Sequence, residues 1–112
     1  MKTKAAIALV FGLAAIQSAQ AQQTYNHTGY GMATTSCGTW TQARKGLETV
    51  NQQNAMVSWA AGYLTATGRF NANMRNTDAD GILSYLDNYC GQHPVAGFET
   101  AVVHLAQELS AQ

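Results

Sequence analysis

The sequence predicts an all-α domain, a small bundle of about four helices closed by one disulfide. Three observations predict it: apolar residues recur at helical spacing in several stretches, no alternating strand pattern competes with them, and the chain carries two cysteines, Cys37 and Cys90. A chain of 112 residues has room for one small domain, whose modest core benefits from a covalent link.

The N-terminal segment, residues 1–21, has the pattern of a signal peptide. It combines a positively charged start, an apolar run over residues 5–16, and the small residues Ala19 and Ala21 that signal peptidase reads. This run is shorter than the roughly 20 residues of a transmembrane helix, and no second run of that length follows. We therefore expect cleavage after Ala21, no membrane anchor, and a mature protein in the periplasm.

An irregular arm and then a short first helix are expected next. Residues 22–35 are polar and contain glycine, with no sustained period, so we expect the arm there and the helical domain over residues 36–112. Thr39 can cap the first helix. The inner side of this helix would carry Trp40, Ala43 and Leu47.

Two longer helices follow. The second begins at a cap provided by Asn51 or Asn54 and ends near Gly68, and a loop rich in asparagine covers residues 69–77. The third helix runs from about Ala79 to Gly91, where glycine is a natural stop. The core-facing residues of these two helices are Met56, Val57, Trp59, Ala60, Tyr63, Leu64, Ile82, Leu83, Tyr85, Leu86, Tyr89 and Cys90.

A fourth helix closes the domain. Pro94 suits its first turn, where the missing N–H costs nothing. Phe98, Val102, Leu105 and Leu109 continue the apolar stripe at helical spacing. The large apolar residues that we expect in the core, or in the interface of a homodimer, are Trp40, Trp59, Tyr63, Leu86 and Phe98.

The two cysteines allow one pairing. Exported thiols oxidise readily, and the wide separation of Cys37 and Cys90 lacks the Cys-x-x-Cys pattern of redox enzymes. We expect a structural disulfide that fastens the start of the first helix to the end of the third. On the chain-entropy model, closing a loop of roughly 50 residues contributes on the order of 4 kcal/mol.

Patterns that would indicate catalysis are sparse. The serines stand in no hydrolase motif and the acidic residues form no evident dyad, so we expect a non-enzymatic protein without a cofactor. His27, His93 and His104 lack the close spacing of a zinc site, although His104 could sense pH from a helix flank. No basic stripe interleaved with aromatic residues is present, so nucleic acid is not an expected partner.

Residues 76–87 resemble the twelve-residue calcium loop of EF-hand proteins, with Gly81 at the sixth position. The oxygen ligands would be Asn76, Asp78, Asp80 and Asp87. The first and last ligands depart from the pattern, because asparagine replaces aspartate and aspartate replaces the longer glutamate. The alternative, which we favour, is that Thr77 or Asp78 caps the third helix and Asp80 lies at its positive end, with no metal.

Three stretches carry a family resemblance: residues 36–40 (SCGTW), 57–64 (VSWAAGYL) and 86–94 (LDNYCGQHP). They resemble small periplasmic helical proteins of the HdeA/HdeB acid-resistance type, in which a cysteine opening the first helix is bridged to one closing the third. The resemblance covers most of residues 36–109. It implies an ATP-independent chaperone, a dimer at neutral pH that loosens when acid protonates its carboxylates and then holds unfolded clients. Carboxylates available for this are Asp78, Asp80, Asp87, Glu99 and Glu108.

Two other hypotheses stay open. Residues 62–64, 85–86 and 93–94 also resemble immunity proteins of the Tai/Rap kind, small periplasmic helical dimers that plug the active site of a toxin. A calcium- or small-ligand-binding module is the third hypothesis, and it depends on residues 76–87. The expected partners are therefore unfolded or specific periplasmic proteins, or a second copy of the chain.

Overall fold

The computed structural model describes residues 28–111, and the signal peptide predicted over residues 1–21 lies outside them, as do residues 22–27 of the arm. Within the described part the chain is all-α, as predicted, with a short 3-10 helix before four α-helices. These elements are η1 (Gly31–Thr34), α1 (Cys37–Arg44), α2 (Val50–Phe70), α3 (Ala79–Gln92) and α4 (Phe98–Ser110).

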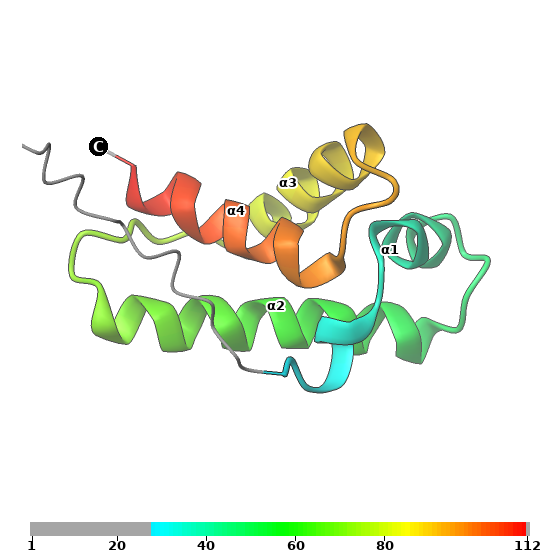
Figure 1. Ribbon diagram of the computed structural model, residues 1–112, viewed down its shortest axis with the longest axis horizontal. Helices are drawn as coiled ribbons and strands as arrows, with labels where there is room; N and C mark the ends of the chain where they lie inside the picture. The colour runs from blue at the N-terminus through cyan, green and yellow to red at the C-terminus, as the bar shows by residue number, and fades with distance from the viewer. Residues whose placement is uncertain (1–27, 112) are drawn as a thin grey trace, which may run out of the picture.

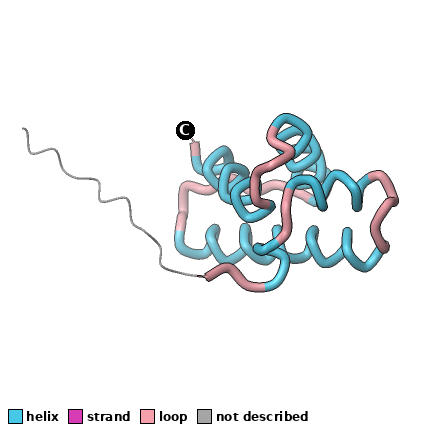
Figure 2. The backbone as a smooth tube through the Cα atoms, turned by 45° about the vertical axis from the view of Figure 1, so that its right-hand side comes forward, coloured by secondary structure: helices cyan, strands magenta, loops and turns pink. Residues whose placement is uncertain are grey.

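The long helix α2 runs along one side of the molecule. Figure 1 shows α1, α3 and α4 gathered over it, and Figure 2 shows the same two-layer arrangement from another side. Among the described helices, none combines the length and apolar character needed to cross a membrane. The core lies between α2 and the other three helices.

The predicted disulfide is confirmed. Cys37 at the start of α1 is bonded to Cys90 in the last turn of α3, with their Cα atoms 4.8 Å apart. Both cysteines are fully buried. The link therefore belongs to the core and closes a long loop through it.

Aromatic rings form the centre of the core. Trp40 and Phe98 are fully buried and stacked, with ring centroids 5.5 Å apart, and Leu86 is fully buried beside them in the same core cluster. Trp59 and Tyr63 lie at the edge, where they are only half-buried and stack on each other at 5.6 Å. Trp59 also contacts Phe98 at 6.0 Å, so the edge pair continues the central one.

The caps of α1 and α2 differ from the predicted ones. Ser36, and not Thr39, caps α1, and its hydroxyl accepts a hydrogen bond from the backbone N–H of Thr39 at 3.1 Å. Thr49, and not Asn51 or Asn54, caps α2. Several polar residues stand before each helix, and each of them could make such a bond. The tertiary structure selects the residue at which the chain turns into the helix.

The start of α4 also differs. Pro94 lies in the connection before the helix, which begins only at Phe98. The reason is a pair of backbone hydrogen bonds of 2.9 Å, from Cys37 N–H to the Ala96 carbonyl and from Phe98 N–H to the Thr35 carbonyl. These bonds hold both chain segments extended, so the helix cannot begin earlier.

Smaller differences concern helix ends and the arm. The second helix continues past Gly68 to Phe70. The first helix, α1, stops at Arg44, so Leu47 lies in the next loop with 68% of its surface exposed and not on the inner side of α1 as predicted. The arm, expected to be irregular, contains the 3-10 helix η1. Its Ala33 is buried against the domain.

Candidate functional site

Two regions of the domain have features that packing alone does not require. The first is the α1–α3 junction, which we define as the disulfide together with Trp40, Arg44 and Asp87. The second is a groove between α2 and the segment that leads into α3.

Asp87 is the centre of the α1–α3 junction. Its Oδ1 accepts a hydrogen bond of 2.9 Å from the indole Nε1 of the buried Trp40, and of 3.0 Å from Nε of Arg44. Its Oδ2 accepts a further bond of 3.0 Å from Nη2 of Arg44. One carboxylate thus satisfies both the ring N–H of a core tryptophan and a guanidinium.

The helix phase brings these groups together. Trp40 and Arg44 are four residues apart on α1, and Asp87 precedes Cys90 by three residues on α3, so each set shares a face with its cysteine. The guanidinium also lies 5.9 Å from the Trp40 ring centroid. Arg44 and Asp87 form the one ion pair found among the described residues.

The electrostatics of the junction are those of a partly exposed site. The side chains of Arg44 and Asp87 are 33% and 41% exposed. The hydrogen bond to Asp87 raises the pKa of the Arg44 guanidinium, burial opposes this, and the charge of Asp87 adds to the increase. Arg44 therefore stays charged.

This arrangement differs from a calcium loop. Asp78 caps α3, with its Oδ1 accepting from the N–H of Gly81 at 2.8 Å, and the chain is helical from Ala79 onward. Asp87 is consequently turned toward α1, and Asp80 is exposed in the first helical turn. In the described residues, no three His, Cys, Asp or Glu side chains are grouped as a metal site.

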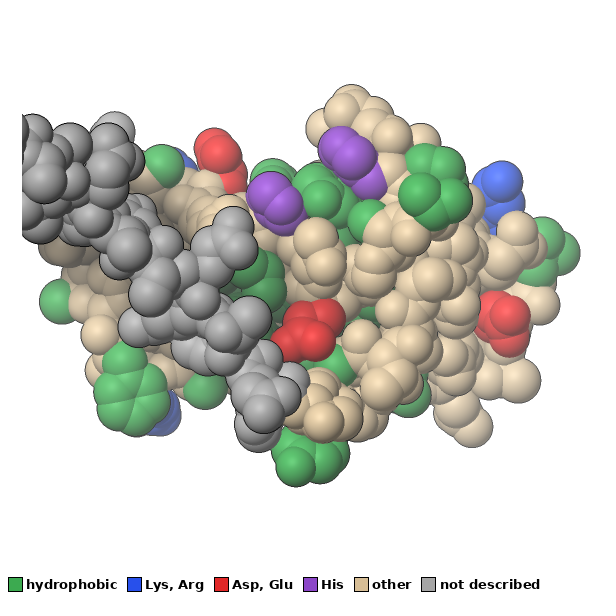
Figure 3. Space-filling view, viewed as in Figure 1, with side chains coloured by type: hydrophobic (Ala, Val, Ile, Leu, Met, Phe, Trp, Pro, Cys, Tyr) green, Lys and Arg blue, Asp and Glu red, His purple; other side chains and the backbone are tan. Residues whose placement is uncertain are grey.

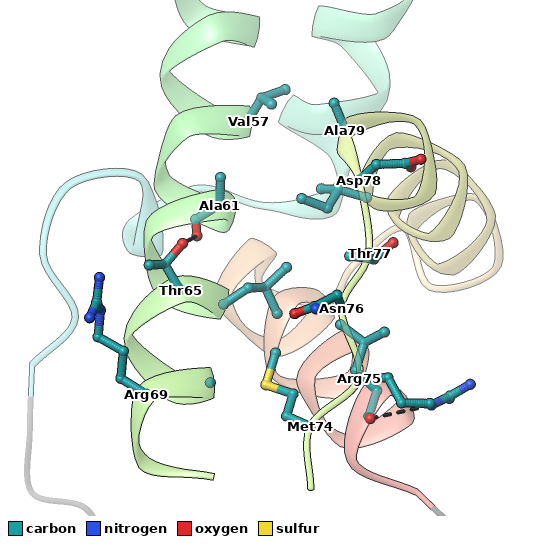
Figure 4. A pocket seen from close by; sticks show the side chains of 14 residues that line it. Val57, Ala61, Thr65, Arg69, Met74, Arg75, Asn76, Thr77, Asp78 and Ala79 are labelled. Carbon is teal, nitrogen blue, oxygen red and sulfur yellow. Dashed lines mark hydrogen bonds between the residues drawn. The ribbon is translucent and has the colours of Figure 1, made fainter. Parts of the chain in front are cut away.

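The groove has a cavity volume of about 530 Å³. Its walls come from α2, α3, α4 and the connection before α3, and they combine apolar with polar residues. The apolar members are Val57, Ala61, Leu64, Met74, Ala79, Ile82 and Leu109. Figure 4 shows Val57 and Ala61 of α2 facing the connecting segment, with the Asn76 side chain directed toward α2 between them and Met74.

The connecting segment, residues 74–78, is fixed at its ends. The backbone N–H of Arg75 donates to the Leu109 carbonyl at 2.8 Å, and its guanidinium donates to the Glu108 carbonyl at 2.7 Å, which satisfies carbonyls at the end of α4. At the other end Asp78 caps α3. Between them, Asn76 has no hydrogen-bond partner among the described residues.

Apart from these two regions, aromatic rings on α3 and α4 form a cluster. The Tyr89 ring stacks with His93 at 4.3 Å and with His104 at 5.0 Å, and Tyr85 stacks with it at 6.2 Å. Figure 3 shows the two histidines of the described part close together, with hydrophobic side chains between them. Burial raises the pKa of Tyr85, and the charge of Glu108 and the neighbouring Tyr89 add to this.

Comparison of the chain with protein-family models, with curated proteins and with solved structures finds no match. The functional interpretation consequently depends on the geometry of these regions.

Sequence reasoning identified the cysteines but missed the role of Asp87. The signal was present, because the predicted disulfide and helix phases already place Trp40 and Arg44 opposite Asp87. The groove had no comparable signal. The lining residues Val57, Leu64, Ile82 and Leu109 have the spacing of core residues, and the gap beside them depends on how four segments pack.

Proposed function

We propose that this chain is an exported, non-enzymatic binding protein that acts as an acid-stress chaperone of the HdeA/HdeB type. One observation carries the proposal: a single carboxylate, Asp87, connects the last turn of α1 to α3 through both Arg44 and the buried indole of Trp40. Protonation of this group would remove the charge that attracts both donors.

The expected consequence is local opening of α1. Its first residue, Cys37, stays bonded to Cys90, so its last turn is the part that can move away. Such a movement would expose Trp40 and the stacked ring of Phe98, which are fully buried in the closed form. Aromatic surface of this kind binds unfolded chains through burial of apolar area.

Magnitudes favour local opening over global unfolding. A partly exposed ion pair contributes about 0.2–1 kcal/mol, and a hydrogen bond to a charged group contributes about 1.5–3 kcal/mol. A domain is typically stable by about 5–15 kcal/mol, so losing Asp87 as an anion would weaken α1 without unfolding the core. The disulfide would preserve the rest of the α1–α3 junction.

The test is light scattering of a periplasmic extract that is taken to about pH 2 to 3 and then neutralised, with and without residues 22–112 of the protein. We expect suppressed aggregation in acid and none when the same protein is assayed only at neutral pH. Asp87→Asn, which lacks the charge at every pH, should suppress aggregation at a milder pH than the wild type.

The matched control is Asp80→Asn, because Asp80 is exposed and makes no hydrogen bond to a described residue. It should leave the pH dependence of suppression unchanged. Absence of suppression by the wild type in acid would refute the chaperone proposal. Equal behaviour of the two Asn variants would refute the role of Asp87 in it.

A dedicated protein partner, as for an immunity protein, is the second candidate. It is favoured by large apolar side chains that are exposed in the closed form, among them Val95 at 97%, Phe70 at 93% and Val50 at 76%. Such residues bury well against a partner or against a second copy of the chain. Retention of one protein in a pull-down at neutral pH, together with no activity in acid, would support this candidate, and dimerisation stays a prediction.

A further inference from the structure

We propose that residues 28–34, the strap, exchange between two copies of the chain, so that each strap lies on the other copy. In the closed chain the strap contains η1, packs against both α2 and α4, and crosses the long helix in Figure 1. The proposal concerns how a dimer would form. It depends on the geometry of the strap and not on the chaperone proposal or on Asp87.

The strap is held by contacts that the same segment of a second copy could make equally well. The indole Nε1–H of Trp59 donates a hydrogen bond of 3.0 Å to the carbonyl of Tyr30. Ala33 is buried, and Met32 is partly buried against the core. The side-chain amide of Gln52 lies 3.9 Å from the Met32 sulfur. None of these contacts is covalent, so they can form again between two copies.

Shape determines which segment fits under these contacts. A Cβ at Gly29 would lie 2.7 Å from both Ala33 Cβ and Oε2 of Glu99, so a larger residue would force the strap to shift. Gly31 has a φ of +61° and lies against the Trp59 indole, with Cδ1 at 3.5 Å from the position of an added Cβ. The surface under the strap therefore favours the pattern Gly-x-Gly-x-Ala. A second copy carries this pattern by definition, which makes it the fitting occupant.

Thr35 provides the hinge. Its N–H donates to the Met32 carbonyl at 3.1 Å within the strap, whereas its own carbonyl accepts from the N–H of Phe98 at 2.9 Å on the domain. Rotation about the two backbone dihedrals of Thr35 can swing the strap outward while both bonds stay formed. The chain beyond the hinge is fixed, because the disulfide holds Cys37 and its N–H donates to the Ala96 carbonyl. The strap can thus leave without disturbing α1.

An exchanged dimer keeps the contacts of the closed chain and adds others near the hinge. Val95, whose side chain is 97% exposed, precedes Ala96, the residue bonded to Cys37 beside the hinge. Two copies joined at their hinges would bring this apolar side chain toward the second copy, where its burial favours association. The main cost is the lost freedom of two separate molecules, so the dimer fraction should rise with protein concentration.

The experiment is an isotope-filtered nuclear Overhauser measurement on the mature chain, residues 22–112, with its disulfide intact, at neutral pH. Equal amounts of isotope-labelled and unlabelled chain are unfolded together in urea and refolded, and the dimer is isolated by size-exclusion chromatography. We expect contacts between the Trp59 Nε1–H of a labelled copy and Gly31 protons of an unlabelled copy. Such contacts arise between two copies only if the straps are exchanged.

Two glycine substitutions form a matched pair. Gly31→Val and Gly46→Val both place a β-branched residue at a positive φ, of +61° and +74°, but an added Cβ at Gly46 would meet nothing within 4 Å. Gly31→Val should raise the dimer Kd by about tenfold or more, while Gly46→Val should leave it unchanged. Sedimentation measures Kd, and helical circular dichroism checks that both variants fold.

Three results would overturn the proposal. The first is the absence of a wild-type dimer at concentrations up to about 1 mM. The second is a dimer in which contacts between Trp59 and Gly31 arise only within one copy, which would indicate association without exchange. The third is an equal Kd for the two glycine variants. The isotope measurement needs no substitution, so its result stands even if Gly31→Val disturbs the fold.

Discussion

The two ends of α3 differ in how they are held. Its C-terminal end is joined to α1 by a disulfide, an ion pair and an indole hydrogen bond, whereas its N-terminal end is held by its own cap, Asp78, and borders an open groove. The end that carries the disulfide and the ion pair is thus separate from the end that borders the groove. We therefore expect changes at one end of α3 to leave the packing of the other end unaltered.

The largest expected effect is loss of the disulfide. The double variant Cys37→Ser and Cys90→Ser should lose about 4 kcal/mol of unfolding free energy, because the bridge closes a loop with a sequence separation of 53. Urea denaturation followed by helical circular dichroism measures this loss. Reduction of the wild type should reproduce it, and a stable, fully helical double variant would show that the α1–α3 junction does not depend on its covalent link.

Asp87→Asn should have the next largest effect, a loss of about 1–3 kcal/mol at neutral pH, because it removes the charge that receives the indole and guanidinium hydrogen bonds. Arg44→Gln removes only the ion pair and should cost about 0.2–1 kcal/mol. Urea denaturation of both variants and of their double variant separates the two contributions. A cost of Asp87→Asn no greater than that of Arg44→Gln would contradict a role for the indole bond.

At the groove end, Arg75→Gln should cost about 0.5–1.5 kcal/mol, because the guanidinium hydrogen bond to the Glu108 carbonyl would be lost. Thermal unfolding measures it. Arg69→Gln is the matched control and should leave stability unchanged, because Arg69 is exposed and bonds to no described residue. Equal destabilisation by the two substitutions would show that Arg75 does not anchor the connecting segment.

The smallest effect concerns alkaline pH. The pKa of Tyr85 is raised in the folded protein, mainly by burial, so the unfolded chain releases this proton first as the pH rises. The contribution to stability is complete below the ordinary tyrosine pKa of about 10 and is lost as the pH rises through the folded value. Tyr85→Phe should therefore flatten the decline in stability above about pH 10, measured by urea denaturation. If stability declines equally in Tyr85→Phe and in the wild type, other groups cause the decline.

Much of the architecture could be predicted from the sequence, because helical periodicity and the presence of two cysteines are local or compositional signals. The stripe from Phe98 to Leu109 and the Cys37–Cys90 bridge are such cases. The caps were harder to predict. Ser36 and Thr39 are equally suitable by type, and hydrogen bonds between distant segments decide between them.

The candidate site was less predictable for the same reason. A linear motif allowed Asp87 as the last ligand of a calcium loop, but the favoured alternative, a cap at Thr77 or Asp78, is confirmed at Asp78. The helix that begins there turns Asp87 toward α1, a contact that the motif did not predict. The groove depends on the relative positions of α2 and the segment before α3. The sequence pattern of neither segment determines the distance between them.

In the proposed opening of α1, the disulfide would also affect how quickly the helix returns to its place. Trp40 lies three residues after Cys37. The bond to Cys90 holds Cys37 within the core cluster to which the Trp40 side chain also belongs. The bridge would therefore give reclosing a higher effective concentration than the chain alone provides, as a very short linker does for two modules. A chain without this bridge would have to find the same position by a wider conformational search, while exposing its aromatic core to other chains.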